Sequence, residues 1–167
     1  MDKHLDQLEQ CLSGMTVQHE QLLSMVRRKL EAMRMAQPDL VADCCQRENE
    51  HVQAIARIEK RRQTVIGEIT SVLAPGSRLP MTLGQIADAV GEPRRGRLLV
   101  MQVKLRQLMQ RIQHENAVSR RATEGLVRHV TGVMQKVTAV VGAANTYGRR
   151  GVANASPATV SSFSLTA

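Results

Sequence analysis

The sequence is almost free of aromatic side chains. Its 167 residues include no Trp, one Tyr and one Phe, yet 43% of them are apolar. A core without aromatic rings has to be filled by aliphatic side chains and Met, which is the usual filling between packed helices. Because charged residues make up 23% of the chain, the composition favours a folded protein over a disordered one.

Long apolar runs are also missing. No run of 18 or more apolar residues occurs, which argues against a membrane-spanning helix, and residues 1–7 lack the apolar stretch of a secretory signal. Cys11, Cys44 and Cys45 are an odd number of cysteines without metal-ligand spacing, a usage typical of a reducing compartment. We therefore expect a soluble cytoplasmic protein with no membrane insertion.

Two apolar repeats predict a long helical hairpin over residues 2–74. Apolar residues step by three and four from Leu5 to Met33 and again from Val41 to Leu73, so that each segment presents one apolar stripe. The sequence Gln-Pro at 37–38 separates them, because proline disfavours helical geometry in the residue before it and suits the first turn of the next helix. A turn this short folds the two helices back antiparallel.

A short connecting helix is expected over residues 82–90. The segment 75–80 is rich in Pro and Gly and breaks the preceding helix. Thr82 and Gln85 then have the spacing of a capping box, in which each side chain bonds the backbone of the other residue. Gly91 closes this helix.

A third long helix is predicted over residues 94–141, with Gly142 as its stop. The fold class is therefore all-α: a coiled-coil-like three-helix bundle, made of the hairpin and this helix, that forms one domain over residues 1–141. Residues 142–167 are dominated by Gly, Ala, Ser, Thr and Asn and keep no helical period, which predicts a flexible tail.

The sequence contains little that indicates a metal site or an active site. Glu48 and His51 form one Glu-x-x-His motif of the kind used in di-iron bundles, and Glu115 lies on the stripe of the third helix, but a second such motif is absent. The hairpin register places Glu48 about 9 Å along the axis from His19, too far to share one ion. We interpret Glu48 and Glu115 as polar residues that set the helix register. With no nucleotide-binding loop or nucleophile–base pair either, we expect no metal, no cofactor and no enzyme activity.

The net charge of +8 is unevenly distributed. Residues 1–92 contain 11 Lys and Arg against 13 Asp and Glu, whereas residues 93–167 contain 12 against 2. Arg94, Arg95 and Arg97 also crowd the positive end of a predicted helix, which suggests either an anionic partner or a solvated helix end. A basic helical nucleic-acid-binding protein is therefore an alternative, although no aromatic residue is placed to stack on a base.

A wide apolar band near the end of the third helix is the main candidate binding site. It is either ordinary core or a face that receives an apolar stretch of another protein. Beyond it, Tyr147 is followed by Gly148 and Gly151, which indicates an aromatic docking anchor in mobile backbone or a ring that folds back onto the bundle. The band consists of Leu126, Val127, Val130, Val133, Met134, Val137, Val140 and Val141.

These features together resemble the FlgN family. The resemblance rests on the leucine-rich N-terminal hairpin, on Asn116 in the middle of the third helix, and on the sequence Thr-Tyr-Gly-Arg-Arg-Gly at 146–151. It implies a cytoplasmic, ATP-independent chaperone of flagellar type III export. Such a chaperone binds unsecreted hook–filament junction proteins by their C-terminal helical regions, prevents premature assembly and delivers them to the export gate.

The resemblance also implies where binding occurs. Carried over to this chain, it points to the apolar band at 126–141 for client binding, and to Tyr147, Gly148 and Gly151 for docking of the tail. A coiled-coil structural or adaptor protein without an export role is a further alternative. Which junction protein is bound, and in what stoichiometry, is left open by the sequence.

Overall fold

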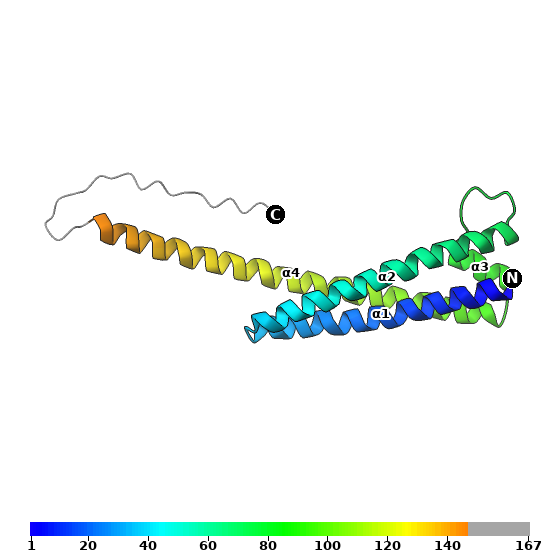
Figure 1. Cartoon of the computed structure of the whole chain (residues 1–167), viewed down its shortest axis with the longest axis horizontal. Coiled ribbons are helices and arrows are strands. Elements are labelled where there is room, and N and C mark those ends of the chain that lie inside the picture. Colours follow the sequence, from blue (N-terminus) through cyan, green and yellow to red (C-terminus); the bar gives the residue numbers. More distant parts are fainter. Residues whose placement is uncertain (147–167) are drawn as a thin grey trace. The chain divides into compact units, whose positions relative to one another are not determined.

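The computed structural model describes the backbone of residues 1–146 and the side chains of residues 1–140. Its helices are α1 (Asp2–Arg34), α2 (Pro38–Leu73), α3 (Leu83–Val90) and α4 (Arg94–Thr146), shown in Figure 1. No strand occurs in this part of the chain, so the predicted all-α class is confirmed. The chain divides into two compact units, Met1–Arg121 and Ala122–Ala167, with α4 beginning in the first and ending in the second.

The last helix is longer than expected. Gly142 was predicted to stop it, but α4 continues to Thr146, so this prediction was wrong. A glycine inside a helix costs only about 1 kcal/mol relative to alanine, and Ala143 and Ala144 directly after it are the strongest helix formers. The expected tail stays a prediction, because its residues 147–167 lie outside the described part.

The hairpin of α1 and α2 is confirmed: the two helices pack against each other and run antiparallel (Figure 1). The turn between them is a Schellman motif, in which Gln37 N–H donates to the Ala32 carbonyl (2.9 Å) and Ala36 N–H donates to the Met33 carbonyl (3.2 Å). Ala36 occupies the left-handed region with φ 53°, where a side chain is strained and glycine is the preferred residue.

We expect Ala36→Gly to raise the free energy of unfolding by about 0.5–1 kcal/mol, because it removes the left-handed strain at some cost in unfolded-state entropy. Urea denaturation of both proteins measures the difference. The matched control is Ala56→Gly, at an exposed position in the middle of α2, which should instead lower the free energy of unfolding by about 1 kcal/mol. Two changes of the same sign would contradict the turn geometry.

A core lies at the end of the first unit opposite the hairpin turn. The capping box at Thr82 and Gln85 is confirmed, and it starts α3 so that this helix can cover that end. A second, smaller cluster joins α1 to α4 further along, through residues such as Val26, Leu108 and Ile112. The first cluster contains Leu5, Leu8, Leu12, Val65, Ile66, Ile69, Leu83, Ile86, Ala87 and Leu98.

Ion pairs show that α4 runs parallel to α1. Asp6 accepts a hydrogen bond from Arg94 (2.8 Å), and Glu115 accepts one from Arg27 (3.1 Å). The partners in both pairs are 88 residues apart, so the two helices keep one register over this length. The first part of α4 is therefore fixed on α1 by charge as well as by apolar packing.

The cysteines behave mostly as core residues. Cys11 and Cys44 are buried as free thiols, and burial raises the pKa of each above its ordinary value. Cys45 is exposed. The two buried thiols are thus poor nucleophiles, because the thiolate is the reactive form.

Candidate protein-binding site

The residues weighed as metal ligands have separate partners. Glu48 Oε2 lies 2.5 Å from Lys29 Nζ, and His51 Nδ1 lies 2.9 Å from Gln18 Oε1, while Glu115 bonds to α1. Within the described residues no three His, Cys, Asp or Glu side chains are grouped so that they could hold a metal ion. Glu48 and Glu115 each join neighbouring helices, as expected of residues that set the register.

The arginines at the start of α4 are bound to carboxylates of the same chain. Besides the bond from Arg94 to Asp6, Arg95 Nε donates to Asp88 Oδ1 (2.8 Å), and Arg97 lies within ion-pair distance of α1. These hydrogen bonds raise the pKa of Arg94 and of Arg95 above the ordinary value. The cluster that suggested an anionic partner therefore holds α4 to α1 and α3.

The apolar band in the second part of α4 is exposed where its side chains are described. Leu126 and Met134 are each 59% exposed and Val140 is 69% exposed, whereas Leu98 near the start of the same helix is fully buried. Val127, Val130, Val133 and Val137 are exposed as well. Contiguous exposed apolar side chains of this kind mark sites of association with other molecules.

The band is wide as well as exposed. Five of its side chains alternate by four and three residues, from Leu126 to Val140, and Val127 and Met134 widen the stripe to one side. The band thus has three apolar positions in every seven residues. Helices in multi-helix bundles have an apolar stripe of this width, whereas a helix of a two-stranded coiled coil has two apolar positions in every seven. Arg128, by its helical position, lies opposite the stripe. The geometry therefore suits the binding of more than one partner helix.

The remaining predicted site residues lie outside the described side chains. Val141 belongs to α4, but its side chain is not among them. Tyr147, Gly148 and Gly151 fall in residues 147–167, beyond the described part of the chain. Their roles in binding stay predictions.

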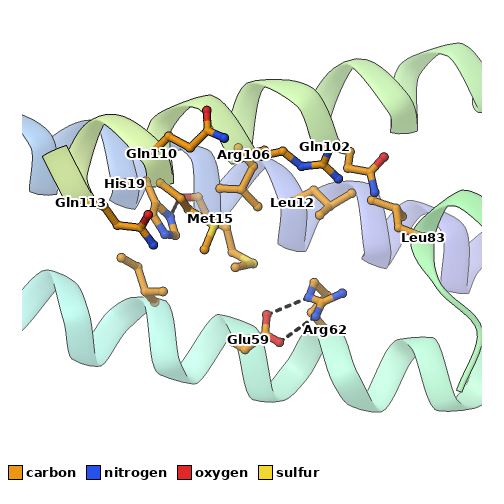
Figure 2. A pocket seen from close by; sticks show the side chains of 13 residues that line it. Leu12, Met15, His19, Glu59, Arg62, Leu83, Gln102, Arg106, Gln110 and Gln113 are labelled. Carbon is orange, nitrogen blue, oxygen red and sulfur yellow. Dashed lines mark hydrogen bonds and ion pairs between the residues drawn. The ribbon is translucent and has the colours of Figure 1, made fainter. Parts of the chain in front are cut away.

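A groove in the first unit was not predicted from the sequence. It has a volume of about 660 Å³ and lies between α2 and α4, with α1 as its floor; Figure 2 shows α2 on one side and α4 on the other. We call it the α2–α4 groove. The sequence offered one signal, the four-residue steps of Gln102, Arg106 and Gln110, which are also typical of a solvated face. Its lining is Leu12, Met15, His19, Ile55, Glu59, Arg62, Leu83, Gln102, Leu105, Arg106, Met109, Gln110 and Gln113.

The charges of the groove differ between its two walls. On α2, Arg62 donates two hydrogen bonds of 2.7 Å to the two carboxylate oxygens of Glu59, visible as dashed lines in Figure 2. These bonds hold the pKa of Glu59 below its ordinary value. Both side chains of the pair therefore stay ionised, and their charges cancel. On α4, Arg106 is exposed and makes no ion pair within the described residues. The groove therefore carries one uncompensated positive charge on the α4 side.

No helix within residues 1–146 has an apolar stretch long enough to cross a membrane. Among known proteins, a family model described as FlgN protein matches residues 1–155 of the chain. No curated protein and no solved structure matches the chain.

Proposed function

Because the chain belongs to the FlgN family of flagellar export chaperones, we propose that it binds unsecreted hook–filament junction proteins in the cytoplasm. In this proposal it holds their C-terminal helical regions, prevents premature assembly and delivers them to the flagellar export gate. Binding and release would suffice for this function, without catalysis.

The exposed apolar band of α4 is the observation that carries this proposal. A junction protein that polymerises through amphipathic helices needs those helices covered before export, and the band offers an apolar helix face of matching kind. Covering its seven described side chains, each about half exposed, contributes on the order of 1 kcal/mol apiece. Together they contribute about 7 kcal/mol, which offsets only the lower part of the association cost of about 4–15 kcal/mol, so contacts of the partner's own apolar face must supply the rest of the affinity.

The test is size-exclusion chromatography with light scattering on the full chain mixed with the C-terminal region of a hook–filament junction protein. We expect a discrete complex that persists at high salt, because apolar contacts are little affected by ions. A variant without residues 147–167 keeps α4 whole, so its binding shows whether the helix or the tail carries the affinity. The absence of a complex with any junction protein would refute the proposal.

The same experiment addresses the nucleic-acid alternative. Phosphate binding weakens steeply with salt, because each contact releases condensed counterions. A complex with nucleic acid that disappears between 50 and 200 mM salt, together with no junction-protein complex, would favour that alternative. The pairing of Arg94, Arg95 and Arg97 within the chain argues against it.

Tyr147→Ala is expected to weaken binding about tenfold without changing helix content, because a single aromatic anchor in a docking segment contributes on the order of 1–2 kcal/mol. Isothermal titration with the junction-protein fragment and with the cytoplasmic part of the export gate shows which partner the tail serves. Circular dichroism checks the helix content. Unchanged affinity for both partners would remove Tyr147 from the site.

A further inference from the structure

We propose that the α2–α4 groove is a second protein-docking site, which takes an acidic amphipathic helix of about three turns from a partner protein. This site is separate from the apolar band of α4, since all its lining residues belong to Met1–Arg121. The proposal does not depend on the identity of the junction protein.

The spacing and length of the groove walls suit the binding of an additional helix from a partner. On α2, Ile55, Glu59 and Arg62 are spaced by four and three residues, which places them on one helix face. The α4 wall runs from Gln102 to Gln113, about 17 Å at the rise of a helix. A helix of that length and about 10 Å in diameter occupies about 1,300 Å³. The groove of about 660 Å³ is smaller than this, so it receives one face of the helix rather than the whole of it.

Apolar side chains line the depth of the groove. Leu12 and Met15 of α1 are buried at its floor, and Met109 on the α4 wall is 45% exposed. Methionine adapts its shape to different partners, so two methionines at the contact favour the binding of an apolar helix face without demanding one sequence. The occupant therefore presents an apolar stripe to α1.

The charge of the occupant follows from Arg106. The other basic residues at the start of α4, Arg94, Arg95, Arg97 and Lys104, form ion pairs with carboxylates of α1 or α3, whereas Arg106 has no such partner in the described residues. The side-chain amides of Gln102 and Gln110 lie beside it on the same wall and can donate to a carboxylate (Figure 2). A helix with carboxylates along one edge of its apolar stripe matches this wall, and a basic helix does not.

Methionine methyl groups provide the test. The chain has nine Met residues, of which Met15 and Met109 line the groove and Met134 lies in the apolar band. The full chain, labelled with ¹³C at the Met methyl groups, is titrated with a synthetic helical peptide that carries Leu at helical spacing and Glu beside the stripe. A second peptide has Lys in place of every Glu. We expect the acidic peptide to shift the Met15 and Met109 signals to saturation, and the basic peptide to bind at least tenfold more weakly.

Variants of exposed arginines complete the experiment. Arg106→Glu should lower the affinity for the acidic peptide at least tenfold, and Arg106→Lys should keep most of that affinity. Arg111→Glu is the matched control, since Arg111 is exposed on the same helix and does not line the groove. Unmoved Met15 and Met109 signals, equal affinity for both peptides, or equal effects of the two Glu variants would overturn the proposal. Shifts of Met15 and Met109 that grow with protein concentration alone would assign the groove to a second copy instead.

Discussion

Replacing Lys29 with Met is expected to lower the free energy of unfolding by about 3 kcal/mol, as measured by urea denaturation at neutral pH. The Lys29 and Glu48 side chains are only 14% and 15% exposed, and they form an ion pair of 2.5 Å between α1 and α2. The second carboxylate oxygen, Glu48 Oε1, is buried and has no hydrogen-bond partner among the described residues. Removing Lys29 leaves a largely buried carboxylate without compensation, which is costly because that charge has also lost most of its water.

The double variant Lys29→Met/Glu48→Met separates this explanation from a simple loss of packing. With both charges gone, apolar side chains of similar length fill the seam, and most of the lost stability should return. Arg34→Met is the matched control, because its ion pair with Glu31 is exposed on both sides and should cost less than about 0.5 kcal/mol. A double variant as unstable as Lys29→Met would show that the pair does not act through the buried charge.

Local signals in the sequence predicted the helices well, because each depends on neighbouring residues. Proline at 38, the capping box at Thr82 and Gln85, and the three-four apolar spacing set where helices begin and which face is apolar. Gly142 was misleading as a stop signal, because one glycine costs a helix only about 1 kcal/mol and the two alanines directly after it favour the helix. The fold class followed from periodicity, and the resemblance to the FlgN family, which the family model confirms, from the hairpin, Asn116 and the tail sequence together.

Partners distant in the sequence could not be predicted in this way. Glu48 is recognisable in the sequence as a polar residue that sets the helix register, but a shift of one helical turn would pair it with a residue other than Lys29. Arg94 and Asp6 are 88 residues apart, so their pairing depends on how α4 packs on α1. The α2–α4 groove arises from the packing of three helices together, and no single helix contains its pattern.

Val133→Glu is expected to reduce the affinity for the junction-protein fragment at least a hundredfold while leaving folding stability within about 0.5 kcal/mol. Val133 is 45% exposed in the middle of the apolar band, so a charged side chain there remains hydrated in the unbound chain. In the proposed complex the same carboxylate is buried against an apolar helix without a partner, which costs several kcal/mol. Isothermal titration measures the affinity, and thermal unfolding measures the stability.

The control for this variant is Gln135→Glu, which adds the same charge to an exposed position that helical spacing places on the other side of α4. Equal losses from both variants would indicate general repulsion by the added charge. A large loss of stability in Val133→Glu would instead identify the band as core, the alternative that its apolar pattern also allows. The band is assigned to client binding only if Val133→Glu loses affinity but keeps its stability, and Gln135→Glu keeps its affinity. This combination identifies an interface, because an interface residue is exposed to water in the free chain and buried in the complex.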